Sequence, residues 1–143
     1  MIEKAFTALS ADSRRRITEH IANLGNPNPV AAHKSELCLS HFGPKAVDLL
    51  IIAASSSDPQ VRFRVVWALG KSRDNRALPT LLALTDDPDE RVRYDAVLAL
   101  GELGDVQAIA SLEEIARRSS DPAALDSAAL CALTKLKSLY ETP

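Results

Sequence analysis

The chain of 143 residues repeats itself about every 31 positions. Residues 61–70, VRFRVVWALG, align with residues 92–101, VRYDAVLALG, and a third, drifted copy follows at residues 125–133. A fixed period between about 20 and 50 residues is the signature of stacked supersecondary units that bury their apolar faces against their neighbours. The repeat therefore predicts one domain, residues 1–143, built as an array of similar units.

Each unit is expected to be a pair of antiparallel helices. Apolar residues recur at helical spacing in both halves of the unit, and strand signals are absent from the sequence. An Asp-Pro pair precedes each copy of the first helix and places an N-cap acceptor before a proline suited to the first turn. These pairs are Asp58-Pro59, Asp87-Pro88 and Asp121-Pro122. The sequence thus predicts an all-α solenoid of helical hairpins.

The turns between the paired helices carry glycine and aspartate. Gly70 and Gly101 are expected to close the first helices in the left-handed conformation that glycine adopts without strain. Asp74 and Asp105 follow them and are expected to cap the second helices.

The repeat pattern weakens toward both ends of the chain. Residues 1–29 hold two short apolar stripes, with Ser10 as a helix cap between them and Gly25 as a stop, and they fit a divergent terminal unit that protects the stack. We expect three repeats and a partial C-terminal repeat after this cap. The repeats are residues 30–57, 58–86 and 87–118, and the partial repeat is residues 119–143.

Charge and cysteine content favour a cytoplasmic protein that binds neither nucleic acid nor membrane. Seventeen Lys and Arg oppose nineteen Asp and Glu, for a net charge of -2, and both signs are spread along the chain. The densest basic run, residues 14–16, points in several directions around a helix and has acidic neighbours. The longest apolar run, residues 49–54, is too short to cross a bilayer, and the two cysteines are expected to be buried thiols of a reducing compartment.

The order Asp-Pro, Val-Arg, Ala-Leu-Gly, with Leu-Gly-Asp in the second copy, resembles the HEAT repeat family, and in particular its variant named for phycobilisome lyase subunits. The resemblance is strong over residues 58–118 and partial over residues 44–57 and 121–139. It implies a right-handed superhelix with the first helices on the convex face and the second helices on the concave face. Such repeats serve mostly as protein-binding scaffolds, so the expected partner is another protein or a second copy of the chain. A subunit of a bilin lyase-like complex and a nucleic-acid-binding HEAT-like protein are the alternatives.

The chain lacks the residue patterns of common catalytic sites. Its five glycines form no phosphate-binding loop, its three histidines form no helical zinc motif, and Cys38 with His41 supplies too few ligands for zinc. Deoxyhypusine hydroxylase, an enzyme similar in its repeats, holds two iron ions with His-Glu dipeptides just after the repeat arginine. Here those positions are Phe63-Arg64 and Tyr94-Asp95. We therefore expect no enzymatic activity, no metal and no cofactor.

The repeat arginines are candidates for a structural role. Arg62 and Arg93 directly follow a core valine, and they are expected to bind aspartates of the turns and caps in a ladder between units. The candidate aspartates are Asp58, Asp74, Asp89 and Asp105.

The concave face is the first candidate binding surface. It is expected to carry residues that lie beside the apolar stripe of the second helices and change from basic to acidic along the stack. These residues are Lys45, Leu49, Arg76, Thr80, Gln107, Ser111 and Glu114. An ordinary solvated surface is the alternative.

An apolar patch on the convex face is the second candidate. The third and seventh positions of the Val-Arg helix are commonly charged in this family, but here they are Phe63 and Trp67, then Tyr94 and Leu98. Residues four apart share a helix face and neighbouring units stack, so the four are expected to form one patch. If exposed, the patch is a homodimer contact or a docking site for another protein. If the N-terminal helices or the neighbouring unit cover it, the patch is core.

Overall fold

The computed structural model describes residues 9–118 and 125–140, which form helices and the short connections between them. Within these residues the helices, where η marks a 3-10 helix, are α2 (Ala11–Ala22), η1 (Asn23–Gly25), α3 (Pro29–Phe42), α4 (Pro44–Ala53), α5 (Pro59–Ser72), η2 (Asn75–Ala77), α6 (Leu78–Leu84), α7 (Glu90–Leu103), α8 (Ala108–Arg118) and α9 (Leu125–Tyr140). The first apolar stripe of the predicted cap, before Leu9, and the pair Asp121-Pro122 lie outside the described residues.

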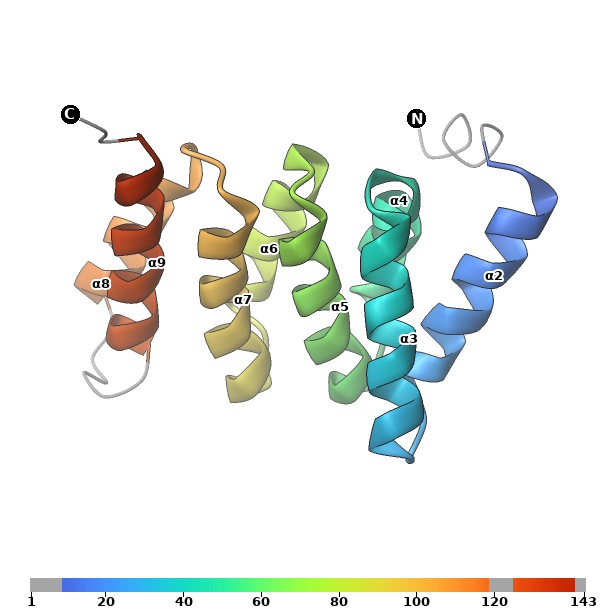
Figure 1. The fold of residues 1–143 in the computed structure, drawn as a ribbon. Helices are drawn as coiled ribbons and strands as arrows, with labels where there is room; N and C mark the ends of the chain where they lie inside the picture. Colours follow the sequence, from blue (N-terminus) through green and yellow to red (C-terminus); the bar gives the residue numbers. More distant parts are fainter. Residues whose placement is uncertain (1–8, 119–124, 141–143) are drawn as a thin grey trace.

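The helices form two layers (Figure 1). Helices α3, α5, α7 and α9 stand side by side in one layer, which we call the first-helix layer, while α4, α6 and α8 form the second-helix layer. Helix α2 lies against α3 at one end of the stack, and α9 lies at the other end. This arrangement confirms the predicted all-α solenoid of helical hairpins. Among the described helices, none is both long and apolar enough to cross a membrane.

The apolar stripes of both layers meet in a continuous core. Val65 and Leu69 of α5 are fully buried, and so is Leu100 of α7, which occupies the position of Leu69 in the next repeat. Leu81 of α6 and Leu112 of α8 belong to the same cluster from the second-helix layer. Full burial of one leucine stabilises the fold by about 1.5–3 kcal/mol, so the recurring apolar contact holds the units together.

Side-chain caps set the starts of most helices. Ser10, Asn28 and Asp58 each accept a hydrogen bond from a backbone N–H in the first turn of α2, α3 and α5. Asp74 and Asp105 accept backbone N–H groups in the same way at the turns before α6 and α8. These orphan N–H groups have no partner within their own helix, so each cap stabilises its helix by about 1 kcal/mol.

The cap of α7 differs from the prediction. Its N-cap is Asp89, which accepts a hydrogen bond from the Arg91 N–H at 2.9 Å, and not Asp87. Asp89 is the repeat equivalent of the cap Asp58, whereas Asp87 is the equivalent of Ser56. The repeat register, and not the local Asp-Pro pair, therefore locates the cap and leaves the Asp87 side chain available for another contact.

Gly70 and Gly101 lie within helices and do not end them, contrary to the prediction. The C-cap of α5 is Arg73, a non-glycine residue in the left-handed region with φ 52°, and the C-cap of α7 is Gly104 with φ 79°. Among the described glycines of the two turns, only Gly104 therefore uses the conformational freedom of glycine to close a helix.

The two helical glycines allow close contact between neighbouring first helices. A Cβ atom on Gly70 would lie 2.9 Å from the Cβ of Ala99, and a Cβ on Gly101 would lie 2.9 Å from the Cα of Ala132. Both distances are shorter than ordinary carbon contacts. Helices α5 and α7, and likewise α7 and α9, touch here almost backbone to backbone.

We expect Gly70→Ala to lower the melting temperature. Alanine at a helix position normally stabilises by about 1 kcal/mol relative to glycine, but here the methyl group overpacks the contact with Ala99, at a cost of about 1–3 kcal/mol. Thermal unfolding followed by circular dichroism measures the change. Thr134→Ala, at an exposed position of α9, is the control and should not lower it. A Gly70→Ala protein as stable as the wild type would contradict this account.

Candidate functional site

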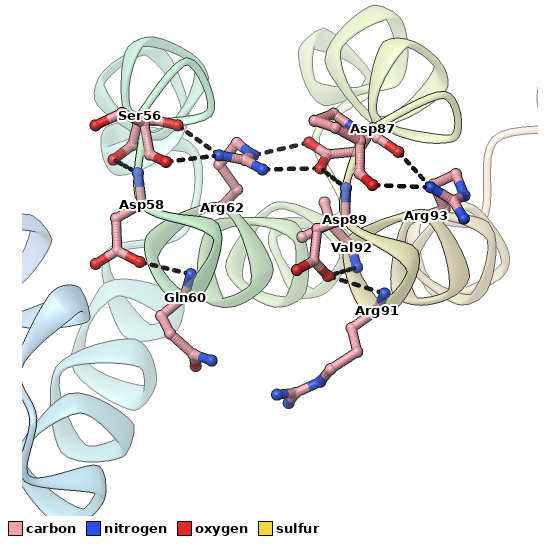
Figure 2. A network of polar contacts seen from close by, with 11 residues as sticks. Ser56, Asp58, Gln60, Arg62, Asp87, Asp89, Arg91, Val92 and Arg93 are labelled. Atoms are coloured by element: carbon pink, nitrogen blue, oxygen red, sulfur yellow. Dashed lines mark hydrogen bonds and ion pairs between the residues drawn. The ribbon is translucent and has the colours of Figure 1, made fainter.

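Arg62 connects two loops of the stack through a bidentate ion pair (Figure 2). From α5, its Nε and Nη2 atoms donate to Oδ2 and Oδ1 of Asp87 at 2.8 and 2.9 Å. Its Nη1 atom donates to the carbonyl oxygens of Ser56 and Ser57 at 2.9 and 3.2 Å. The guanidinium therefore joins the loop before α5 to the loop before α7.

In the next repeat, Arg93 forms the equivalent hydrogen bonds to backbone carbonyl groups. Its Nη1 atom donates to the carbonyl oxygens of Asp87 and Pro88 at 2.8 and 3.1 Å (Figure 2). These two acceptors are the repeat equivalents of the two that bind Arg62. The segment that corresponds to the Asp87 loop in the following unit, residues 119–124, lies outside the described residues.

The partner of Arg62 differs from the predicted ones. Asp74, a predicted member of the ladder, binds Arg76 instead. The side chain of Asp105, the other predicted member, accepts a hydrogen bond from the backbone N–H of Gln107. Both aspartates are occupied in turns, and the aspartate that joins the units is Asp87.

The side chain of Asp87 is only 3% exposed and is held as a carboxylate. Burial by itself raises its pKa, but hydrogen bonds from Arg62 and from the Asp89 N–H outweigh burial and leave the pKa below its ordinary value. The folded state thus binds the proton of this carboxyl less tightly than the unfolded chain does. This contribution to stability is present above about pH 4 and is lost as the pH falls through the lowered pKa.

Arg76, a candidate of the concave face, is bound by its own chain. Its Nη1 atom lies 2.8 Å from Oδ2 of Asp48, and its Nη2 atom lies 2.7 Å from Oδ2 of Asp74 and 2.8 Å from the Pro44 carbonyl oxygen. The hydrogen bond with Asp74 raises the pKa of Arg76. Arg76 therefore ties the start of α4 to the turn before α6.

The other concave-face candidates do not form one site. Leu49 is 8% exposed and belongs to the core, which corrects its predicted place on the surface. Ser111 and Glu114 line a groove of about 350 Å³ between α6 and α8. The candidates outside this groove that have at least partly exposed side chains are Lys45, Arg76, Thr80 and Gln107.

Three of the four convex-face candidates come together. Phe63, Trp67 and Tyr94 line a groove of about 430 Å³ between α5 and α7, and each of the three side chains is half-buried. Leu98 is half-buried against the core and does not line the groove. We call this hollow the aromatic groove. Within the described residues its lining comes from α5 and α7 alone.

Charged residues to which the sequence analysis gave no binding role complete the aromatic groove. Glu90 and Arg91 line it with exposed side chains, and the Arg91 Cζ atom lies 4.5 Å from the centroid of the Phe63 ring. Asp95 lines it as well and is only 9% exposed. Burial raises the pKa of Asp95, and the opposing effects of a hydrogen bond from Trp67 and of the Arg91 charge are smaller.

One sequence signal points to Asp95. It takes the position of Arg64 in the preceding unit, so the charge at this border of the buried stripe reverses from one repeat to the next.

A smaller hollow of about 240 Å³ contains the Cys38 and His41 pair. Arg16 and Phe42 complete its lining. Among the described residues, no group of three or more His, Cys, Asp or Glu side chains is placed to hold a metal ion. Cys38 is half-buried and Cys131 is exposed, which corrects the expectation of two buried thiols.

The arginines of the basic run at residues 14–16 contact different side chains. Arg15 pairs with Asp12 at 2.9 Å, and the Arg16 Cζ atom lies 5.5 Å from the centroid of the Phe42 ring. Two of the three arginines thus point toward different partners within the chain.

Comparison with known proteins identifies the family. The family model for HEAT repeats matches residues 2–91 and again residues 46–133. The chain belongs to the HEAT repeat family. None of the curated proteins matches this HEAT repeat protein.

A solved structure supports the same fold. The structure of human deoxyhypusine hydroxylase in complex with glycerol superposes with a TM-score of 0.72 at 23% sequence identity. The match covers 89% of this HEAT repeat protein and 45% of the hydroxylase chain, so it spans less than half of that enzyme. At this identity the likeness shows the fold alone.

We expect Arg62→Ala to lower the free energy of unfolding by about 3 kcal/mol, because it leaves the buried Asp87 carboxylate without its cation. Urea denaturation at neutral pH measures this loss. Arg117→Ala removes an exposed ion pair with Glu114 and should change stability far less. Equal small effects of the two substitutions would show that the Arg62 contact does not hold the units together.

Asp95→Asn should raise the melting temperature at neutral pH. A carboxyl whose pKa is raised by folding binds its proton more tightly in the folded state, so its ionisation destabilises the fold as the pH rises through the raised pKa. The gain should shrink as the pH falls toward about 4, near the ordinary pKa of aspartate. Glu90 and Arg91, the other charged groups of the groove, are the same in both proteins. Melting curves across this pH range would contradict the prediction if the difference were constant.

Proposed function

We propose that this HEAT repeat protein is a non-enzymatic scaffold that binds a protein partner through the aromatic groove. The observation that carries the proposal is the set of half-buried rings of Phe63, Trp67 and Tyr94 around a hollow of about 430 Å³. Tryptophan and tyrosine dominate the binding energy of protein interfaces when they lie at the centre of a pocket. A monomer gains nothing in stability from leaving such ring faces open to water.

The second-helix layer offers a weaker site. Arg76 is bound to Asp48 and Asp74, and Leu49 is buried, so two members of the predicted set have structural partners within the chain. Among the described residues that line the groove around Ser111 and Glu114, none is aromatic. The aromatic groove is therefore the better candidate for the main contact.

The residues at the dipeptide positions support a role without catalysis. The family resemblance implies that Phe63, Tyr94 and Asp95 stand at the positions of iron-binding dipeptides in deoxyhypusine hydroxylase, and here all three line the aromatic groove. Arg64, the fourth residue, pairs with Glu36 at 3.3 Å. The chemistry at these four positions supports a scaffold better than an iron site of that kind.

An affinity pull-down with mass spectrometry, followed by binding measurements with the captured protein, tests the proposal. Trp67→Ala should weaken the association by about 30-fold or more, as expected for a central aromatic anchor, and leave the circular dichroism spectrum intact. Arg118→Ala, in the groove between α6 and α8, is the matched control and should bind normally. Sedimentation velocity of both variants tests the case in which the partner is a second copy of the chain.

The opposite pattern, with binding kept by Trp67→Ala and lost by Arg118→Ala, would move the interface to the second-helix layer and overturn the proposal.

A further inference from the structure

Carboxylates lie between neighbouring helices of the first-helix layer, and cations bind two of them. Between α3 and α5, Glu36 is 5% exposed, and its carboxylate oxygens lie 3.3 Å from Nη1 of Arg64 and 3.6 Å from Nζ of Lys71. Between α7 and α9, Glu102 pairs with Lys135. At both junctions the cation comes from a residue of the protein itself.

The junction between α5 and α7 is different. Its carboxylate, Asp95, is 9% exposed, and among the described residues no basic side chain lies within ion-pair distance of it. Trp67 and Arg91 line the groove beside it, and Arg91 acts on it through its charge. A buried carboxylate without a cation is destabilising, and such groups are typical of binding sites in hollows.

The aromatic rings beside Asp95 already attract cations of the chain. The Arg91 guanidinium lies over Phe63 at 4.5 Å, and the Lys71 ammonium lies 5.7 Å from the centroid of the Trp67 ring. A cation over an aromatic face is stabilised by the negative charge of the π system, and most strongly so over tryptophan. The groove therefore combines cation-binding ring faces with a carboxylate that lacks a cation.

We propose that the aromatic groove binds a basic side chain, a lysine or an arginine, of the partner protein. The inference rests on the proposed function and adds the chemistry of the partner. The aliphatic stem of such a side chain packs against the rings, and its charged end binds Asp95. Two negative charges, Glu90 and Asp95, and one positive charge, Arg91, line the groove, while the nearby Lys71 is already paired with Glu36. One added cation therefore balances the charges of the lining.

Other occupants fit this chemistry less well. An apolar side chain fills the space but removes the remaining water from Asp95 without replacing it by a charge partner. An acidic side chain adds a second negative charge beside Asp95 and is repelled. The basic side chain alone satisfies both the rings and the carboxylate.

Trp67 provides a direct measurement, because it is the only tryptophan of the chain and gives a single indole N–H signal in a proton–nitrogen correlation spectrum. The full chain is titrated with the amides of Nα-acetyl-lysine and Nα-acetyl-arginine, and with those of the neutral analogues Nα-acetyl-norleucine and Nα-acetyl-citrulline. We expect the two cationic probes to shift the indole signal about fivefold more steeply than their neutral counterparts, since a charged hydrogen bond is added.

Two variants locate the binding energy. Asp95→Asn should reduce the slope for the cationic probes to that of the neutral ones. Asp86→Asn is the matched control, because it removes an exposed carboxylate beside α6, in the lining of the other groove. It should leave the slope unchanged.

Equal shifts with charged and neutral probes, an unchanged slope in Asp95→Asn, or no shift with any probe would each overturn the inference. The proposed function fails on a different result, which is normal binding of the captured partner by Trp67→Ala. A groove that binds its partner through Trp67 but ignores basic probes would keep the function and exclude the basic side chain.

Discussion

The contact between Gly70 and Ala99 sets the distance between α5 and α7, and the aromatic groove depends on that distance. Trp67 lies one turn before Gly70, and Asp95 lies one turn before Ala99. Because the two helices nearly touch at the glycine, the indole of one helix is brought to the carboxylate of the other. The rings of Phe63, Trp67 and Tyr94 lie half-buried beside this contact and line the hollow. The same close packing that joins the units thus opens a binding surface beside it.

Two buried aspartates of the stack have opposite effects on stability. Asp87 is bound by Arg62 and its pKa is lowered, so its ionised form stabilises the fold at neutral pH. Asp95 lies beside Trp67 and has no ion pair with the described residues, and burial raises its pKa. Its ionised form destabilises the fold under the same conditions. The opposite pKa shifts thus distinguish Asp87, which stabilises the fold, from Asp95, whose charge can be paired by a ligand.

The period of the repeat was enough to predict the hairpins, because apolar spacing decides which helix face is buried. It did not show what each equivalent residue contacts. The Asp87-Pro88 pair has the local chemistry of a helix start. In the structure, however, Asp89 is the N-cap of α7 and Asp87 forms the ion pair with Arg62. Gly70 was expected to end a helix, but its lack of a side chain serves contact with the next helix. The sequence predicted that the aromatic side chains share a surface. It did not show that Asp95 of α7 lies in the same groove as Trp67 of α5.

The contacts of the repeat arginines have a consequence for how such a chain changes in length. Arg62 and Arg93 each bind the carbonyl oxygens of the residues six and five positions before them. These acceptors belong to the backbone, so every unit that keeps its arginine and its loop length offers the same contact whatever its side chains are. The glycine contacts recur from one junction to the next, with Gly101 against Ala132 following Gly70 against Ala99. A whole repeat unit can therefore be duplicated or lost in evolution while the contacts between the remaining units are kept.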